Sequence, residues 1–438
     1  MTHLATFLKK IESKEALIGI VGLGYVGLPL AIAYADHGYR VLGLDIDPRK
    51  PEAIAAGRAY LKHIPGSRFA PHVAAGRLQA TCDFARAREC DAVLICVPTP
   101  LNESREPDTS FIEASARAIL PGLHPGQLVS LESSTYPGTT DELVRAILEG
   151  GSPYRAGRDF FLVFSPERED PGNPTFHTAN IPKVVGGYTP DCLKAGEALY
   201  AAAVERVVPV SSTRAAEMVK LLENTFRAVN IALVNELKLI CERMDLDVWE
   251  VIRAAATKPF GYQPFWPGPG LGGHCIPIDP FYLTWKARQY DLTTRFIELA
   301  GEINTNMPYH VVERAQDALN GKRKSLNGAR VLVLGAAYKP DIDDMRESPA
   351  LKIIELLREK GAQVEYHDPH VPALPPTRKH RLEMSSVPLD EARLKAADCV
   401  VVVTHHKAID WQLVARAASL IVDSRNVVPR DHGNVVGA

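Results

Sequence analysis

The segment ALIGIVGLGYVGLPLAIAYADHGYRVLGLDID, residues 16–47, restricts the possible folds more than any other part of the chain. It begins with a short apolar stretch, 16–21, of the kind that forms buried parallel strands. A glycine-rich turn, a helix that ends near Gly38 and a second strand, 40–44, follow. This order predicts a Rossmann-like α/β fold built on a parallel sheet.

The turn contains the pattern Gly-x-Gly-x-x-Gly, formed by Gly22, Gly24 and Gly27. The first glycine permits a tight turn, the second lets the backbone approach a pyrophosphate, and the third lets the helix pack on the strand. Tyr25 and Val26 stand at the helix start, where free N–H groups bind phosphate. We therefore predict a dinucleotide site at these five residues, against the alternative of a Rossmann-like fold without a ligand.

Polar residues follow the strands of this predicted sheet. Asp45 ends the second strand, where a carboxylate binds the adenosine ribose and repels the extra phosphate of NADP, so NAD is the expected cofactor. CDAVLICVPTP (90–100) ends in Pro98 and Thr99, and LVSLESSTYPGTT (128–140) carries Thr135. Ligands bind beyond the carboxyl ends of parallel strands, so these three residues are predicted to contact NAD. A helix-capping role for Ser133, Ser134 or Thr135 is equally consistent with the spacing.

The middle of the chain changes to a helical pattern. Residues 212–244 have apolar positions at threes and fours, which predicts one long helix able to connect domains and support a dimer interface. Lys220 and Asn224 are four residues apart and share one face of it. For Lys220 alone, a solvated surface lysine is the simpler interpretation.

A second strand–turn–helix–strand pattern begins at residue 329, after a polar linker. Its turn keeps one glycine of the fingerprint, Gly335, so a second NAD is not expected there. Lys339 and Arg346 instead suit another phosphate-bearing ligand, with plain surface charge as the alternative. We predict an NAD-binding domain at 1–208, a helical domain at 209–317 and a second Rossmann-like domain at 318–438.

Composition excludes several other classes. The formal net charge of −2 argues against nucleic acid and anionic membranes as partners. The seven cysteines are scattered without a Cys-x-x-Cys pair, so neither a disulfide framework nor a metal site is expected. No apolar stretch resembles a signal peptide or a membrane span, and a reducing cytoplasm is the expected location.

The loop GPGLGGHCIPIDP, residues 268–280, places Cys275 among glycines and prolines. A buried structural cysteine is one interpretation, because free cysteine is among the most buried residue types. A nucleophile is the other, because a thiol is partly ionised near neutral pH whereas a serine hydroxyl is not.

The chain resembles the UDP-glucose/GDP-mannose dehydrogenase family over nearly its whole length. Six segments occur in that family's order and spacing: GLGYVGLPLA, ESSTYPGTT, FSPERED, AAEMVKLLENTFRAVNIALVNE, GPGLGGHCIPIDP and YKPDIDDMRESPA. The resemblance implies two Rossmann-like, doubly wound parallel-sheet domains joined by a long helix and a helical dimerisation domain. It also implies a UDP-sugar substrate, a homodimer or higher homo-oligomer, and oxidation of a sugar C6 alcohol to a carboxylate with two NAD.

The resemblance implies a role for each residue that matches a family motif. Cys275 corresponds to the nucleophile, which adds to the aldehyde so that a second oxidation leaves a thioester for water to cleave. Lys220 corresponds to the residue that stabilises oxyanions, and Asn224 contacts the same substrate end. Asp279 and Thr135 position a water, and Glu167 activates it. Further substrate contacts are expected from Arg168, Lys258, Gly272, Tyr338 and Lys339, and Arg346 is assigned to the cofactor.

Within the family, the loops look most like the branch that oxidises UDP-N-acetylglucosamine for surface polysaccharides. Ile278 stands where UDP-glucose dehydrogenases usually carry lysine, and Lys258 is the sole cation where they supply an arginine. UDP-N-acetylmannosamine, UDP-galactosamine-type sugars, UDP-glucose and GDP-mannose stay open as substrates. A two-electron hydroxyacid dehydrogenase and a catalytically silent nucleotide-sugar or NAD sensor are the more distant alternatives.

Overall fold

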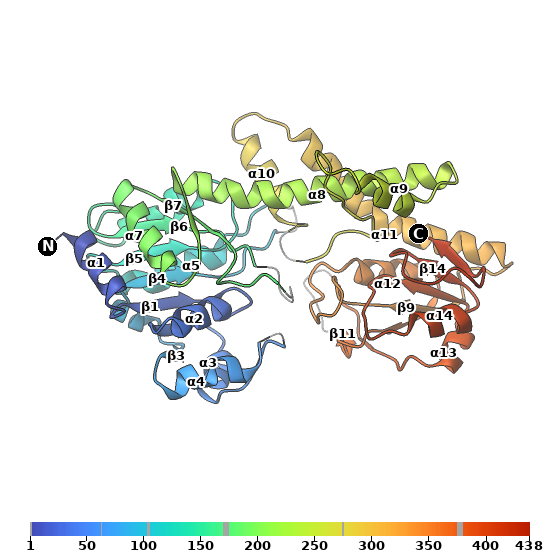
Figure 1. The fold of residues 1–438 in the computed structure, drawn as a ribbon, viewed down its shortest axis with the longest axis horizontal. Helices are drawn as coiled ribbons and strands as arrows, with labels where there is room; N and C mark the ends of the chain where they lie inside the picture. The colour runs from blue at the N-terminus through green and yellow to red at the C-terminus, as the bar shows by residue number, and fades with distance from the viewer. Residues whose placement is uncertain (1, 63, 103–105, 170–174, 274–275, 375–379) are drawn as a thin grey trace. The chain divides into compact units, whose positions relative to one another are not determined.

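The computed structural model describes residues 2–62, 64–102, 106–169, 175–273, 276–374 and 380–438. The chain forms two compact units. The first unit comprises Met1–Glu223 and Trp285–Asp291, and the second comprises Asn224–Thr284 and Leu292–Ala438. Figure 1 draws the first unit mostly in blue and green and the second mostly in yellow to red.

The first unit is built on a sheet that has eight strands within the described residues, in the order β3-β2-β1-β4-β5-β6-β7-β8. The strands are β1 Leu17–Val21, β2 Arg40–Leu44, β3 Leu78–Thr81, β4 Ala92–Ile95, β5 Leu128–Leu131, β6 Phe161–Phe164, β7 Lys183–Gly187 and β8 Val207–Val210. The helices of this unit are α1 His3–Glu12, α2 Gly27–Asp36, α3 Arg49–Ala55, α4 Ala70–Ala74, α5 Ser110–Ile119, α6 Arg145–Gly150 and α7 Pro190–Ala201, with η4 Thr139–Val144 before α6.

Alternate side chains of the central strands enter two different cores, one on each face of this sheet. Leu94 of β4 packs in the core formed with α1, α2 and α7, whereas Val93 and Ile95 pack in the core formed with α5 and α6. This burial of both faces explains the nearly continuous apolar runs in the sequence. The predicted doubly wound fold is thereby confirmed (Figure 1).

One strand pair departs from the predicted parallel arrangement. β6 and β7 are antiparallel, with Val163 opposite Gly187, while the other pairs of this sheet are parallel. A parallel neighbour requires a crossover, usually through a helix. The described residues between Phe164 and Lys183 form no helix, and β7 therefore runs back beside β6.

The second unit contains a sheet of five strands among the described residues, all parallel, in the order β10-β9-β13-β14-β15. Its strands are β9 Arg330–Leu334, β10 Gln363–His367, β13 Cys399–Val402, β14 Ile421–Asp423 and β15 Val435–Gly437, beside a small pair β11 Ala373–Leu374 and β12 Met384–Ser385. The remaining helices are α8 Thr213–Arg243, α9 Val248–Ala255, α10 Asp279–Arg288, α11 Arg295–Gly321, α12 Pro349–Glu359, α13 Glu391–Ala396 and α14 Trp411–Ala417.

The predicted long helix is α8, which begins in the first unit and continues into the second. The second Rossmann-like pattern is confirmed by β9, α12 and β10, with β9 buried at four of its five residues. The division into three domains at 208 and 317 stays a prediction. Within the described residues, none of the helices combines the length and apolar character that a bilayer crossing requires.

Candidate functional site

The glycine turn after β1 has the geometry that its fingerprint predicts. Gly22 has φ +91°, and a Cβ there would lie 2.5 Å from the carbonyl oxygen of Cys96. A Cβ on Gly27 would lie 1.8 Å from the carbonyl oxygen of Gly22, so only glycine lets α2 start this close to the turn. Around Gly24, by contrast, a Cβ would meet nothing within 4 Å. The space beside Gly24 therefore fits a dinucleotide pyrophosphate at the start of α2, beside its N-cap residue Val26.

Asp45 lies buried at the end of β2 and braces the same turn. Its Oδ2 atom accepts hydrogen bonds from the backbone N–H of Leu23 at 2.7 Å and from Nζ of Lys50 at 2.7 Å. Lys50 is not predicted from the sequence, although a lysine five residues after the acid and at the second position of the next helix is a signal for such a contact. The carboxylate stands where the ribose contact is predicted, and the contact itself stays a prediction.

The ends of β4 and β5 are tied together by a hydroxyl. Ser133 Oγ accepts a hydrogen bond from the backbone N–H of Val97 at 3.0 Å and donates to its carbonyl at 2.8 Å. Thr135 is buried, and its hydroxyl lies 2.8 Å from that of Thr139 at the start of η4. Thr99 is buried and Pro98 is exposed beside them. Ser133 thus has a structural role, and Thr135 stays available as a predicted ligand residue.

Glu167, just after β6, belongs to a buried ionic network. Lys183 Nζ lies 2.8 Å from Glu167 Oε2 and 2.6 Å from Glu132 Oε2. Burial would raise the pKa of the Glu167 carboxyl, but Lys183 and the adjacent backbone N–H of Arg168 hold it below its usual value. The pKa of Glu132 is raised, because burial outweighs the attraction of Lys183. Glu167 is predicted from the sequence, whereas Glu132 and Lys183 are not.

Lys220 of α8 reaches the same region of the first unit. Its Nζ donates a hydrogen bond to the backbone carbonyl of Glu167 at 2.5 Å, and the side chain is buried. The solvated-surface interpretation of Lys220 is therefore wrong. Arg168, a predicted substrate contact, forms an ion pair with Glu223 of α8 at 2.5 Å and donates to the carbonyl of Pro182 at 2.7 Å.

In the second unit, Asn224 and Asp279 lie together. Asn224 Nδ2 donates to Asp279 Oδ2 at 2.6 Å, and Asp279 is buried as the first residue of α10. The start of the cysteine loop is held by a buried amide, because Asn235 Oδ1 accepts the N–H of Gly268 at 2.9 Å. Asn235 also donates to Asn304 of α11 at 2.9 Å. Cys275 lies outside the described residues, and its role stays a prediction.

The glycines of the cysteine loop pack against Tyr338. A Cβ on Gly272 would lie 2.5 Å from the Tyr338 Cβ, and one on Gly273 would lie 3.0 Å from its ring. The N–H of Gly273 also donates to the carbonyl of Arg346 at 3.0 Å. Close backbone packing thus explains these two glycines. The Arg346 guanidinium forms an ion pair with Asp344 at 2.6 Å.

Two predicted cations of the second unit differ in their surroundings. Lys339 is half-buried in the segment after Tyr338. Lys258 is exposed, with its Nζ 5.1 Å from the centre of the Phe260 ring. Among the described residues, no contact joins Lys258 to Asn224 or Asp279. The substrate contact of Lys258 stays a prediction.

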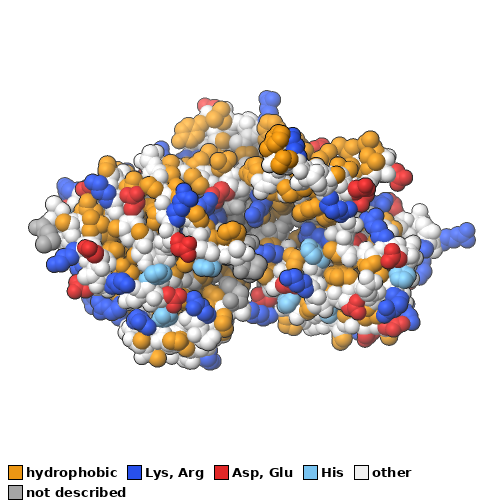
Figure 2. All heavy atoms as spheres, in the orientation of Figure 1, with side chains coloured by type: hydrophobic (Ala, Val, Ile, Leu, Met, Phe, Trp, Pro, Cys, Tyr) orange, Lys and Arg blue, Asp and Glu red, His pale blue; other side chains and the backbone are white. Residues whose placement is uncertain are grey.

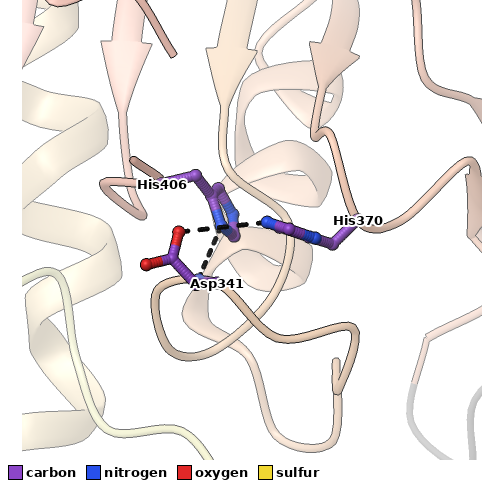
Figure 3. Close-up of side chains that lie close together, drawn as sticks. All are labelled: Asp341, His370 and His406. Carbon is purple, nitrogen blue, oxygen red and sulfur yellow. Dashed lines mark hydrogen bonds and ion pairs between the residues drawn. The ribbon is translucent and has the colours of Figure 1, made fainter. Parts of the chain in front are cut away.

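Figure 3 shows Asp341, His370 and His406 side by side, with possible ligand atoms within 4.8 Å of one another. The backbone N–H of Asp341 donates to His406 Nδ1 at 3.0 Å, and His406 Nε2 lies 2.9 Å from the Asp368 carboxylate. Both ring nitrogens of His406 are therefore used in hydrogen bonds. We interpret the cluster as a network that holds the second glycine turn and not as a metal centre.

Asp368 completes that turn. Its Oδ2 accepts the successive N–H groups of Ala336 at 2.7 Å and Ala337 at 2.9 Å. Burial opposes ionisation, but His406 and the backbone N–H groups of Ala337 and His370 hold the pKa of Asp368 at about 2. The two N–H groups that follow Gly335 are thus bound within the protein.

Three sequence profiles match the chain, and all describe the UDP-glucose/GDP-mannose dehydrogenase family. The NAD binding domain matches residues 16–204, the central domain residues 214–306 and the UDP binding domain residues 332–430. Together they cover most of the sequence in the order in which the two sheets and the helical region occur.

Individual proteins match over almost the full chain. UDP-N-acetyl-D-mannosamine dehydrogenase of Yersinia pestis is 36% identical over 402 residues, which cover 89% of this chain and 93% of that protein. The solved UDP-D-ManNAc dehydrogenase of Pyrococcus horikoshii has a TM-score of 0.87 at 33% identity, covering 96% of this chain and 98% of its own. An NDP-N-acetyl-D-galactosaminuronic acid dehydrogenase of Methanosarcina mazei Go1 has a TM-score of 0.82 at 32% identity, covering 100% and 97%.

Proposed function

The chain belongs to the UDP-glucose/GDP-mannose dehydrogenase family, and we propose that it oxidises the C6 hydroxyl of UDP-N-acetylmannosamine to the carboxylate with two NAD. The observation that carries the proposal is the contact of Lys220 with Glu167. Glu167 follows β6, and the NAD-binding turn follows β1 of the same sheet. The neighbouring strands β1, β4, β5 and β6 all run parallel. Glu167, its partner Lys220 and the NAD-binding turn therefore lie at the same edge of the sheet, where the carboxyl ends of these strands meet.

The proposed chemistry assigns a task to each group. When bound, NAD takes up the hydride that leaves C6 in each of the two oxidations. Lys220, buried and cationic, stabilises the alkoxide at C6, because a charge in a dry site acts strongly on a developing oxyanion. Asn224 orients Asp279, which binds the water that hydrolyses the final thioester.

Cys275 makes the second oxidation possible. An aldehyde has no hydroxyl from which to lose a second hydride. Addition of the thiolate to the aldehyde carbon forms a C–S bond and restores an alkoxide, and loss of hydride leaves a thioester. Water then attacks the carbonyl carbon, the C–S bond breaks, and the thiol and the sugar carboxylate are released. Glu167, held ionised by Lys183, accepts the proton of that water.

The sugar proposed here differs from the first expectation. The sequence loops suggested the gluco epimer, whereas relatives at 36% and 33% identity are named for N-acetylmannosamine. Ile278 is buried where a lysine would mark a UDP-glucose enzyme, which supports an N-acetyl sugar of either epimer. We therefore place the mannosamine derivative first and the glucosamine derivative second.

We also propose that α8 supports a homodimer. Phe226, Leu233, Leu237 and Ile240 recur at helical spacing on α8 and are each at least 39% exposed. Figure 2 shows further apolar side chains over the part of the second unit that Figure 1 labels α9. An apolar stripe of this length on a water-facing helix is typical of an interface. A second copy of the chain is the proposed partner, and light scattering would show whether the particle has twice the chain mass.

A panel of nucleotide sugars, each mixed with NAD, tests the proposed function. We expect NAD reduction with UDP-N-acetylmannosamine, two NADH for each sugar consumed, and at least about tenfold lower kcat/KM with UDP-glucose. A ratio of one with a stable aldehyde would contradict the four-electron reaction. Binding of NAD and sugar without any reduction would favour the silent binding protein.

A further inference from the structure

The lysine beside Glu167 takes no part in the chemistry proposed above, yet it is one of the most deeply buried charges in the first unit. Lys183 is the first residue of β7 and is 3% exposed. Its ammonium group bridges two buried carboxylates, those of Glu132 after β5 and Glu167 after β6. Such a triad is a poor source of stability, because desolvation of the charges offsets their attraction. Its presence therefore calls for another explanation.

The two carboxylates have different hydrogen-bond partners. Glu167 Oε1 accepts the backbone N–H groups of Arg168 and Glu169, both at 2.7 Å, while Oε2 accepts Lys183 at 2.8 Å. Each of these donors favours the ionised carboxylate. Glu132 accepts only side-chain donors in this network, Lys183 and the hydroxyl of Tyr200. The surroundings thus push the pKa values of the two acids apart.

We infer that Lys183 is a positioning residue that keeps Glu167 ionised and aimed at its water, with Glu132 as the second carboxylate that holds the ammonium group in place. This inference rests on the proposed function. Lys183 touches neither substrate nor cofactor in this scheme and acts through Glu167.

The groups that face Glu167 come from several elements. They are Lys183 of β7, Glu132 after β5, Lys220 and Glu223 of α8, the adjacent Arg168, and the thiol of Cys96 after β4. Lys220 donates to the backbone carbonyl of Glu167, and Arg168 is paired with Glu223. Lys183 is therefore the cation that directly binds the Glu167 carboxylate among the described residues, and its removal leaves two carboxylates facing each other.

The test is the pH profile of turnover in Lys183→Met, Lys183→Arg and wild type. The quantity compared is the ratio of turnover at pH 6 to turnover at pH 8.5. We expect this ratio to be about tenfold lower in Lys183→Met than in wild type, because Glu167 becomes protonated. KM for NAD and for the nucleotide sugar should change little. Lys183→Arg should restore the wild-type profile, since the arginine also supplies a cation. Profiles of identical shape in all three proteins would overturn the inference.

A double variant guards against failure to fold. Lys183→Met combined with Glu132→Gln removes one charge of each sign, so no new uncompensated pair is buried. In the double variant, the infrared carboxylic-acid band of Glu167 should appear at pH 6. The band should be missing in Glu132→Gln alone, and it should vanish when Glu167→Gln is added to the double variant. If this band is absent, the inference is overturned, and this result does not depend on any measurement of activity. A wild type that binds ligands without reducing NAD would instead contradict the proposed function.

Discussion

Glu217 of α8 binds Thr140 of η4 twice, through the backbone N–H at 2.9 Å and through the hydroxyl at 2.7 Å, both to Oε1. The second oxygen of the carboxylate accepts the N–H of Gly138 at 2.5 Å. These bonds attach the segment that carries Thr135 to the helix that carries Lys220. Two predicted site residues from distant parts of the sequence thus depend on one buried carboxylate for their relative placement.

Glu217 should make the stability of the protein depend on pH. Burial raises the pKa of its carboxyl to about 7, against 4.5 for an exposed glutamate, and so the protonated form is favoured in the folded state. The contribution of Glu217 to the free energy of unfolding is full below about pH 4.5 and is lost as the pH rises through about 7. This change amounts to roughly 3 kcal/mol. Glu217→Gln should remove this part of the dependence in thermal melts between pH 4.5 and 8. Glu223→Gln, on the same helix but half-buried, is the matched control, and equal slopes in all three proteins would contradict the assignment.

Asp45 should control the choice of cofactor. Its replacement by alanine removes the negative charge and leaves Lys50, now without its partner, free to attract the extra phosphate of NADP. We expect the preference for NAD over NADP to relax by roughly 1–3 kcal/mol, measured as the ratio of the two kcat/KM values. Asp47→Ala changes an adjacent carboxylate that pairs with Arg49 and should leave the ratio unchanged. Equal use of both cofactors by the wild type would show that Asp45 does not face the ribose.

Lys220→Met should lower kcat by about a hundredfold or more, because it removes the buried cation that we propose stabilises the reacting oxygen. NAD affinity should stay near the wild-type value, since the glycine turn is untouched. Stopped-flow measurement of the first NADH separates this effect from product release. Lys322→Met, at an exposed position after α11, is the control and should retain full turnover. An unchanged first oxidation in Lys220→Met would remove Lys220 from the chemistry.

Cys275→Ala should fold and bind both ligands, yet form the acid several orders of magnitude more slowly, as expected when a covalent step is removed. Acid formation is normalised to folded protein and compared with melting temperature. Cys82→Ala changes an exposed free cysteine and should behave as wild type. A packing role for Cys275 predicts the opposite result, with lower stability and normal turnover per folded molecule.

Local patterns in the sequence were sufficient to predict the helices and strands named below and the turn that is expected to bind the cofactor. Short apolar runs predicted β1 and β2, and apolar positions at threes and fours predicted α8. Gly22, Gly24 and Gly27 predicted the turn, because backbone geometry depends on the side chains at the position itself. The family motifs predicted Lys220 and Glu167 as site residues. The antiparallel β6–β7 pair was not predictable in this way, because strand direction depends on the connection and not on the strand's own pattern.

Only the tertiary structure decided which side chains meet. Lys183 and Glu132 are ordinary charges in the sequence, 51 residues apart, and their contact exists because β5, β6 and β7 are neighbours in the sheet. The same holds for Asn224 with Asp279 and for Glu217 with Thr140. Hydrophobic periodicity determines which face of an element is buried, whereas the partner of a buried charge depends on strand order, register and helix placement. The sequence by itself therefore determined the elements and the cofactor turn, and the fold decided which charges surround the residues predicted to be catalytic.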